Sequence, residues 1–296
     1  MINKTAMIAI VGRPNVGKST IVNVLTGDKV AIVSPKPQTT RNRIYGVFAF
    51  GETQMVLLDT PGFHKAKTRL GDYMVGVVKE SVSDVDAVAL VVEPVDSIGT
   101  QEDKLIEHIA ASKVPAILVI NKIDTVKVDS VLPIINRYSQ RYAFDAIVPV
   151  SAKKEIGITD LAGVFDRFAV EGPQLFPDGM STDQPEKQII AEIIREKLLV
   201  CLDKELPHGT AVEITKFTER EDDEIIDVDA TIYCEKASHK GMIIGKQGAM
   251  LKRIGQMARE DIERFMGAKV FLQTWVKVKE NWRDSKMMMK NFGYTK

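Results

Sequence analysis

Short runs of consecutive apolar residues alternate with helical patterns over residues 1–175. The runs that read as strands are 6–11, 55–58, 87–92, 116–120 and 146–150. Apolar residues at consecutive positions are typical of strands buried on both faces. The segments between them carry helical spacing, as at Leu105, Ile106, Ile109 and Ala110. This alternation predicts an α/β domain with a mostly parallel sheet, whose ligand lies beyond the carboxyl ends of the strands.

The pattern changes after a segment rich in Pro, Gly, Ser and Asp at 176–186, which we interpret as a linker. Residues 189–202 follow helical spacing, and residues 212–215 and 226–232 alternate as strands do. A glycine-rich stretch at 241–248, a helix at 250–266 and a strand at 270–278 complete the order helix, strand, strand, helix, helix, strand. We therefore expect a first domain at 1–175 and a smaller α+β domain at 187–296.

Composition fits this division. The 296 residues suit about two domains. With 45% apolar and 27% charged residues, the chain is of the globular class, neither fibrous nor disordered. The net charge is zero, but residues 230–296 hold 14 Lys and Arg against 6 Asp and Glu. Such a surplus is typical of a surface that binds a phosphate backbone, and also of a solvated basic face. The stretch 219–229 is strongly acidic, and we interpret the acidic turn between the two predicted strands as a solvated hairpin loop.

Cysteine usage and the apolar runs indicate a compartment. Cys201 and Cys234 have neither metal-ligand nor redox spacing, so we expect reduced core residues. The first residues lack the form of a signal peptide, and no run of about 20 apolar residues occurs. These features favour the cytoplasm.

Residues 12–19 read GRPNVGKS and fit the pattern G-x-x-x-x-G-K-[ST] between a strand and a helix. Glycines let the backbone wrap a phosphate, and the helix N-terminus favours negative charge. Lys18 would reach the β and γ phosphates, and the Ser19 hydroxyl would ligate Mg²⁺. The predicted nucleotide-binding residues here are Gly12, Asn15, Val16, Gly17, Lys18, Ser19 and Thr20.

DTPG at 59–62 ends the second predicted strand. Asp59 there can hold the metal through a water, and the Gly62 N–H can meet the γ phosphate. Taken alone, the DTPG motif would equally indicate a turn without a binding role, because Pro and Gly are common in turns.

NKID at 121–124 and SAK at 151–153 follow later strands. The Asp124 carboxylate can accept two hydrogen bonds from guanine, a pair that adenine lacks. Lys122 can lie over the base, and Asn121 can brace the loop. Ser151, Ala152 and Lys153 complete the set, with the Ala152 N–H directed to the guanine carbonyl.

The order of these four motifs resembles the translation-factor-related P-loop GTPases, and QTTRNR at 38–43 is similar to the first switch of the Era GTPase family. The resemblance implies that Thr40 closes on Mg²⁺ when GTP is bound. It also implies that Asn15 matches an Asn that relatives use to hold K⁺. Phe63 stands where Ras-like enzymes place a water-orienting Gln, so we assign it no catalytic role. His64 reads as a loop residue, because these enzymes rely on positioning and charge. The predicted catalytic residues are Lys18, Thr40 and Gly62.

IIGKQG at 243–248 places a GxxG loop between two helices, where glycine lets a nucleic-acid backbone approach the peptide. The surrounding element order resembles the type II KH domain that the Era family carries at its C-terminus. Ile243, Ile244 and Leu251 would form an apolar floor under the bases. The residues that would bind the RNA backbone are Gly245, Lys246, Gln247, Gly248, Lys252 and Arg253. Trp275 and Trp282 read as packing residues, whereas Met287 to Met289 fit either a buried helix face or an interaction surface.

The resemblance implies a slow GTPase that binds single-stranded RNA near the 3′ end of small-subunit ribosomal RNA and assists assembly of that subunit. Two alternatives stay open: an RNA-binding scaffold with a structural nucleotide, and a related GTPase that acts on another RNA. The basic region also offers a surface for peripheral membrane contact, although RNA already explains its charge.

Overall fold

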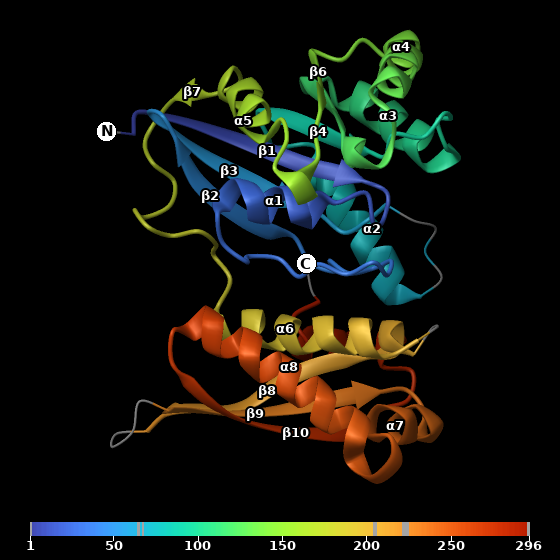
Figure 1. The fold of residues 1–296 in the computed structure, drawn as a ribbon, viewed down its shortest axis with the longest axis vertical. Coiled ribbons are helices and arrows are strands. Elements are labelled where there is room, and N and C mark those ends of the chain that lie inside the picture. Colours follow the sequence, from blue (N-terminus) through green and yellow to red (C-terminus); the bar gives the residue numbers. More distant parts are fainter. Residues whose placement is uncertain (1, 64–65, 67, 204–205, 221–224, 295–296) are drawn as a thin grey trace. The chain divides into compact units, whose positions relative to one another are not determined.

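The computed structural model describes residues 2–63, 66, 68–203, 206–220 and 225–294. Its contacts divide the chain into two compact units (Figure 1). The first comprises Met1–Ala31, Thr40–Ala66 and Met74–Asp183, and the second comprises Ile32–Thr39, Lys67–Tyr73 and Gln184–Lys296. Two short segments from the N-terminal half therefore group with the C-terminal unit, which the linear domain prediction did not anticipate.

The first unit is built on a mixed, mostly parallel sheet, as predicted. Among the described residues its strands run in the order β2-β3-β1-β4-β5-β6, and a short β7 pairs with β1. The strands are β1 (Lys4–Gly12), β2 (Ile44–Phe50), β3 (Thr53–Asp59), β4 (Ala87–Val92), β5 (Ala116–Ile120), β6 (Ala146–Pro149) and β7 (Val170–Glu171). All neighbours pair in parallel except β2 with β3 and β7 with β1.

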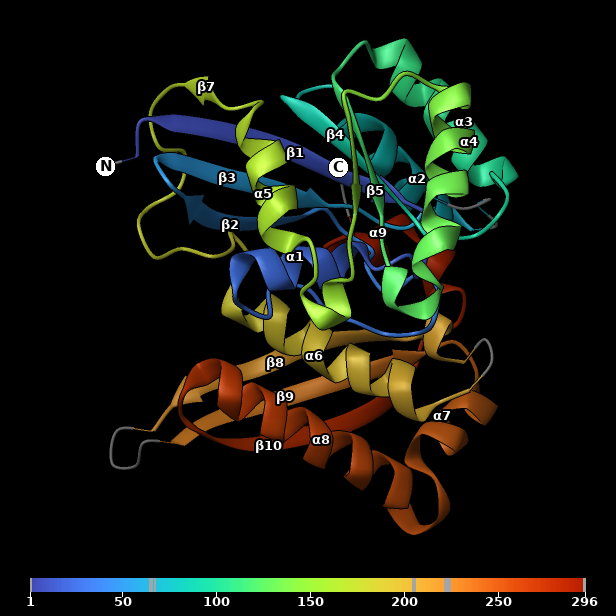
Figure 2. The ribbon, with the colours of Figure 1, turned by 45° about the horizontal axis from the view of Figure 1, so that its top comes forward.

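Helices cover both faces of this sheet (Figure 2). Ile8 and Ile10 of β1 pack into one apolar cluster with helices α1 and α5. Ala9 and Val11 pack into a second cluster with α2, α3 and α4 on the opposite face. The helices are α1 (Lys18–Thr26), α2 (Arg69–Ser81), α3 (Thr100–Ser112), α4 (Val131–Arg141) and α5 (Ile158–Asp166). Burial on both faces is why the strands read as continuous apolar runs.

The second unit has the predicted order and a three-stranded sheet, β10-β9-β8, within its described residues. Its elements are α6 (Glu186–Cys201), β8 (Ala211–Glu219), β9 (Ile225–Cys234), α7 (Ala237–Ile244), α8 (Ala249–Met266), β10 (Lys269–Val278) and α9 (Lys286–Asn291). Alternate residues of β9, such as Val228 and Ile232, enter a core shared with α6 and α8. The predicted fold class, a P-loop α/β domain followed by a smaller α+β domain, is confirmed.

The C-terminal segment corrects one prediction and resolves another. Trp282 is fully buried and donates its Nε1–H to the Gly209 carbonyl at 2.9 Å, so it is a packing residue. Trp275 is 44% exposed, so the prediction that it packs in the core is wrong. Strand alternation explains this, because Val276 takes the buried position beside it. Of the methionine run, Met288 and Met289 are buried and Met287 is exposed, as on one face of a helix.

Two further sequence expectations can be compared with the structure. Cys201 and Cys234 are free thiols; Cys234 is buried in the core as predicted, whereas Cys201 is only half-buried. Within the part of the chain that the structure describes, no helix is both long enough and apolar enough to cross a membrane.

Candidate nucleotide site and nucleic-acid groove

The loop between β1 and α1 wraps tightly because glycine occupies its close approaches. Gly17 precedes α1 with φ of 99°, a left-handed conformation that side chains rarely adopt. A Cβ on Gly17 would collide with the amide of Asn121. Because α1 begins at Lys18, its first backbone N–H groups have no partners within the helix and can bind an anion.

Lys18 lies inside this loop rather than in solvent. Its side chain is buried, and its Nζ donates to the Gly12 carbonyl at 3.2 Å and to the Arg13 carbonyl at 2.9 Å. Burial lowers the pKa of Lys18 to about 8, and the Asp59 carboxylate opposes this shift. A buried ammonium held by neutral carbonyls is stabilised by an anionic ligand, which a phosphate provides.

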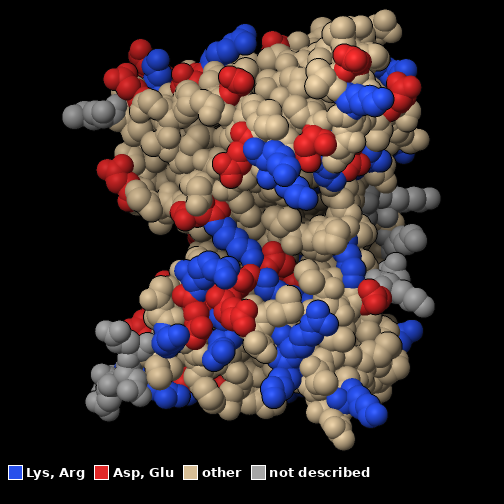
Figure 3. All heavy atoms as spheres, in the orientation of Figure 1, with Lys and Arg blue, Asp and Glu red and all other residues tan. Residues whose placement is uncertain are grey.

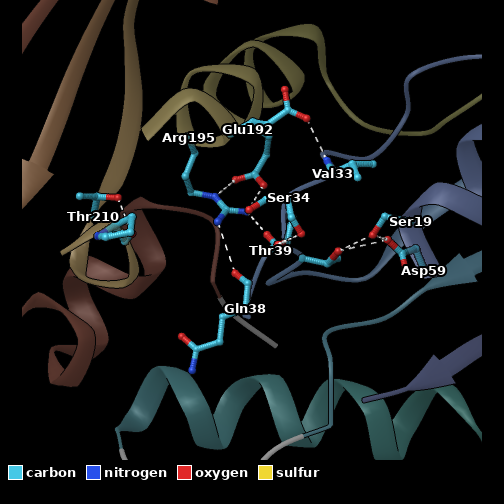
Figure 4. A network of polar contacts seen from close by, with 12 residues as sticks. Ser19, Val33, Ser34, Gln38, Thr39, Asp59, Glu192, Arg195 and Thr210 are labelled. Carbon is cyan, nitrogen blue, oxygen red and sulfur yellow. Dashed lines mark hydrogen bonds and ion pairs between the residues drawn. The ribbon is translucent and has the colours of Figure 1, made fainter. Parts of the chain in front are cut away.

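Three oxygen-bearing side chains from separate segments lie within hydrogen-bonding distance of one another, and Figure 4 shows two of them, Ser19 and Asp59. The Ser19 hydroxyl donates to Oδ2 of Asp59 at 2.7 Å and lies 2.8 Å from Oγ1 of Thr40. Thr40 in turn donates to the same Asp59 oxygen at 3.2 Å. Asp59 is fully buried, and its Oδ1 has no hydrogen-bond partner among the described residues.

The electrostatics of Asp59 indicate a cation site. Burial raises its pKa, while Lys18 and the hydrogen bonds from Ser19 and Thr40 lower it. An unsatisfied buried carboxylate oxygen is costly unless a cation or donor binds it. Two hydroxyls and a carboxylate are hard oxygen donors of the kind that Mg²⁺ takes together with phosphate and water. The residues therefore fit the predicted metal.

The DTPG segment returns to the phosphate loop. Thr60 Oγ1 donates to the Ile10 carbonyl at 2.8 Å, and the Phe63 N–H donates to the Gly12 carbonyl at 3.1 Å. A Cβ on Gly62 would lie 2.7 Å from atoms of Pro14, so only glycine fits this approach. Phe63 is half-buried and packs against the apolar cluster that the sheet shares with α2, α3 and α4. His64 lies outside the described residues.

Asn121 connects the phosphate side of the site to the base side. Its Nδ2 donates to the Val16 carbonyl at 2.8 Å, and its Oδ1 accepts from the Ala152 N–H at 3.0 Å. These two hydrogen bonds join the loop after β5 to the phosphate loop and to the segment that follows β6. The sequence prediction directed the Ala152 N–H to a guanine carbonyl. In the structure this N–H donates to Asn121 Oδ1 instead.

Lys122 and Asp124 flank the position expected for the base. Lys122 adopts a left-handed φ of 65°, and its Nζ donates to the Asn15 carbonyl at 2.6 Å and pairs with Glu93. Asp124 is exposed, and its Oδ1 accepts from the Ser151 hydroxyl at 2.6 Å. The Ser151 hydroxyl fixes the orientation of the Asp124 carboxylate. Because Asp124 is exposed, a ligand can still reach that carboxylate. Of the other predicted residues, Val16 is a core residue, Thr20 is half-buried on α1, and Lys153 is exposed.

The GxxG loop of the second unit is conformationally demanding. Gly245 has φ of 72°, and a Cβ there would lie 2.7 Å from that of Met250. Gln247 and Gly248 also have positive φ, at 51° and 81°. The loop thus turns sharply from α7 into α8 and presents Lys246 and Gln247 to solvent.

A groove of about 560 Å³ begins at this loop and runs between α8 and β10. It is lined by Gly248, Leu251, Lys252, Gly255, Gln256, Arg259, Val270, Phe271, Leu272 and Thr274. Figure 3 shows Lys and Arg side chains on the face of this unit that carries α8. A basic, partly apolar groove beside a GxxG loop suits a single nucleic-acid strand.

The groove both includes and departs from the predicted RNA-binding residues. Gly248, Leu251 and Lys252 line it, whereas Arg253 is exposed but does not. Ile243 is fully buried in the core, so it cannot form a floor under bases, and Ile244 is half-buried.

The sequence prediction missed Gly255, Gln256 and Arg259 and the β10 residues. Helical spacing from Gly248 could have found those on α8, since residues three, four and seven apart share a face.

Comparison with known proteins agrees with this geometry. Residues 7–122 match the family model of a 50S ribosome-binding GTPase, and residues 205–283 match that of the KH domain. GTPase Era of Ruminiclostridium cellulolyticum is 52% identical over 291 residues, covering 98% of this chain and 97% of that protein. GTPase Era of Clostridioides difficile is 51% identical over 292 residues, covering 98% of each.

Two solved structures are similar over nearly their whole length. One is Era in complex with MgGDPNP and nucleotides 1506–1542 of 16S ribosomal RNA, with a TM-score of 0.96 and 36% identity, covering 99% of this chain and 100% of that one. The other is a variant of Aquifex aeolicus Era bound to GDP·AlF4⁻, with a TM-score of 0.95, 36% identity and the same coverage.

The fold and its two sites define a P-loop GTPase with a C-terminal KH domain. At this identity and coverage, the chain belongs to the Era family of GTPases.

Proposed function

We propose that this GTPase is a switch that binds single-stranded ribosomal RNA and assists assembly of the small ribosomal subunit. The observation that carries the proposal is that one chain combines the Ser19, Thr40 and Asp59 cluster with a basic groove beside a GxxG loop. The Era structure that was solved with both MgGDPNP and 16S ribosomal RNA supports it. We assign residues 1–175 to the GTPase domain, 176–186 to the linker and 187–296 to the RNA-binding domain.

In this proposal the phosphate loop holds the nucleotide by its backbone, and Lys18 pairs with the β and γ phosphates. Asp124 reads the guanine base, oriented by the Ser151 hydroxyl. Asn121 holds the loop that binds the base and the loop that binds the phosphates together through its hydrogen bonds with Val16 and Ala152. Gly62 offers its N–H to the γ phosphate from a position that only glycine tolerates. Lys153 and Thr20 complete the set as peripheral contacts.

Mg²⁺ would be held by Ser19, Thr40 and Asp59, where it would neutralise charge on the phosphate oxygens. We also propose that Asn15 contributes to a K⁺ site. Asn15 is exposed at the rim of the phosphate loop, and its backbone has a left-handed φ of 66°. Turnover in K⁺ compared with Na⁺, with Asn15→Ala as the control, tests this assignment.

Hydrolysis rests on positioning and electrostatics by Lys18, Thr40 and Gly62. Phe63 packs in an apolar core and has no group that could orient water. Turnover should therefore be slow without an activating partner. GTP would order the segments around Thr40 and Gly62, and hydrolysis would release them.

RNA binding is assigned to the GxxG loop and the α8–β10 groove. Glycines at 245 and 248 allow the sugar-phosphate backbone to approach. Lys246, Lys252 and Arg253 supply charge, and Leu251 contacts bases within the groove. The strand we expect copies the 3′ end of small-subunit ribosomal RNA.

The first test is binding of a labelled single strand with that sequence, with the protein loaded with GDPNP or with GDP. Tighter binding in the GDPNP state, lost in Gly245→Asp, is the expected result. Equal binding in both states would refute the coupling between nucleotide and RNA. An unrelated strand that binds equally well would favour a GTPase that acts on another RNA.

Lys18→Ala separates the switch from a scaffold whose nucleotide is only structural. The switch proposal expects turnover in the parent protein and none in this variant. A parent protein that binds GTP without hydrolysing it would favour the scaffold.

We place the protein in the cytoplasm, which its free thiols support. We propose peripheral membrane contact through the basic region as a secondary property. Co-sedimentation with anionic vesicles, with and without competing RNA, tests it.

A further inference from the structure

The switch segment is divided between the two compact units. Ile32–Thr39 groups with the C-terminal unit, whereas the next residue, Thr40, groups with the nucleotide-binding unit. One peptide bond therefore joins a residue held by the C-terminal unit to a residue of the predicted metal site. Whatever fixes the backbone of residue 39 also restricts where Thr40 can place its hydroxyl.

Helix α6 holds this segment with a charged face that is buried. Positions 192, 195 and 196 form one charged stripe of the helix, beside the apolar positions that enter the core of its own unit. On a surface helix such a polar stripe faces water. Here Arg195 is 1% exposed and Glu196 is 5% exposed. Burying charged groups is costly, so their partners must be specific.

The partners are backbone groups of the switch segment (Figure 4). The guanidinium of Arg195 donates to the carbonyls of Thr39 and, at 3.5 Å, of Gln38. Glu196 Oε1 accepts from the Val33 N–H at 2.9 Å. The two side chains thus hold both ends of the segment to one turn of α6.

Glu192 orients the guanidinium. Arg195 Nε donates to Glu192 Oε1 at 2.8 Å, and a second Arg195 nitrogen donates to Oε2 of the same carboxylate. This bidentate pairing with Glu192 uses one edge of the rigid, planar guanidinium. Another edge of the guanidinium then donates to the carbonyls of Gln38 and Thr39. A lysine has a single ammonium and cannot satisfy both edges.

We propose that Arg195 is a positioning residue for GTP hydrolysis, which acts by fixing the Gln38 and Thr39 carbonyls so that Thr40 reaches the Ser19 and Asp59 cluster. The inference rests on the metal-site role proposed above for Thr40. It assigns to a helix of the RNA-binding unit a direct part in the GTP-bound state. Because Thr40 would matter only when the γ phosphate and Mg²⁺ are bound, Arg195 should leave GDP binding unaffected.

The test uses the full-length protein and the variant Arg195→Lys. We expect its affinity for Mg²⁺–GDPNP to fall about tenfold while its affinity for GDP changes by less than about twofold, a separation typical of coupled sites. The Mg²⁺ concentration that half-saturates turnover should rise in parallel. Arg220→Lys is the matched control, since Arg220 also pairs with a carboxylate, that of Asp227, but this pair is exposed. It should bind both nucleotides as the parent does.

Two further variants make every outcome decisive. Thr40→Ala should lose GDPNP affinity selectively, and the double variant should be no weaker than Thr40→Ala, since both changes act on one group. If Thr40→Ala is not selective, the proposed role of Thr40 fails. If Thr40→Ala is selective but Arg195→Lys weakens both nucleotides equally, or neither, only the Arg195 inference fails. Should Arg195→Lys not fold, Glu192→Gln removes the orienting charge, and the same selective loss is expected.

Discussion

The Ser19 hydroxyl lies 2.7 Å from Oδ2 of Asp59, although 40 positions separate the two residues in the chain. Ser19 stands in the first turn of α1, and Asp59 is the last residue of β3. Because β3 and β1 are parallel neighbours, the end of β3 lies beside the loop that follows β1. A carboxylate and a hydroxyl thereby share one buried corner with the ammonium of Lys18.

The pKa of Lys18 leads to a prediction on stability. Below about pH 8, Lys18 is charged in both the folded and the unfolded chain, so the cost of burying the charge is complete. Between about pH 8 and 10.5 the folded chain binds fewer protons than the unfolded one, so the free energy of unfolding rises with pH. Lys18→Met removes this contribution, so the free energy of unfolding of the nucleotide-free parent, relative to that of Lys18→Met, should increase by about 1–3 kcal/mol between pH 7 and pH 10.

Urea unfolding of nucleotide-free protein at the two pH values measures this difference. Lys153→Met, on an exposed lysine, is the control and should change little. A difference between the two proteins that stays constant or falls from pH 7 to pH 10 would contradict the predicted burial cost.

Gly62→Ala should slow GTP turnover by about 100-fold, because the new Cβ would push the γ-phosphate contact away from the loop at Pro14. Single-turnover hydrolysis measures the effect. Gly163→Ala is a matched control within α5, where a Cβ meets nothing within 4 Å. It should keep the parental rate and gain about 0.5–1 kcal/mol in stability. Equal rates in both variants would show that Gly62 is not needed near the phosphate.

Asp124→Asn should lower affinity for GDP by about 100-fold or more and raise affinity for the xanthine nucleotide. Xanthine presents a carbonyl where guanine presents an amine, so the amide donor of Asn restores the lost hydrogen bond. Competition binding with GDP, XDP and ADP measures the change. Asp129→Asn, on a neighbouring exposed turn, should leave the preference intact. If ADP competes as well as GDP in the unmutated protein, the hypothesis that residues 121–124 select guanine is wrong.

Arg259→Ala should weaken binding of the single-stranded RNA and reduce the slope of log affinity against log salt by about one unit, since Arg259 lines the groove and would contact one phosphate. Arg264→Ala is the control on the same helix, because Arg264 pairs with Asp261 and does not line the groove. Titrations at several salt concentrations distinguish the two. An equal slope change in both variants would indicate diffuse charge attraction rather than a contact in the groove.

The two tryptophans should differ sharply in stability. Trp282→Ala removes a fully buried ring that packs edge-on against Phe292 at 5.2 Å, so we expect a loss of about 3–5 kcal/mol. Trp275→Ala, on the exposed face of β10, should cost about 0.5 kcal/mol. Urea unfolding followed by circular dichroism measures both without relying on tryptophan fluorescence. Comparable losses would mean that the exposed face of β10 is packed in solution.

The sequence by itself determined the architecture and the chemistry of the nucleotide site. Strands buried on both faces must be apolar at consecutive positions, so these strands can be recognised from the sequence alone. The phosphate loop can also be recognised from the sequence, because the close approach of its backbone to a phosphate requires glycine at fixed spacing. The order of helices and strands in the second unit followed from the change in hydrophobic period.

Strand β2 was missed by the sequence prediction. It is an edge strand paired in antiparallel fashion with β3. Local composition carries little information about an edge, whose partner lies elsewhere in the chain.

The tertiary structure alone decided which side of each element faces solvent and which segments meet. The sequence predicted both Trp275 and Trp282 as packing residues, yet strand alternation exposes the first while Gly209 and Phe292 enclose the second.

The contact between Arg195 and the carbonyl of Thr39 joins residues 156 positions apart. No periodicity encodes such a pairing, because a backbone carbonyl has no residue type to reveal it. Whether a charged residue on a helix lies in water or is buried against another segment depends on distant packing, and only the folded chain specifies that.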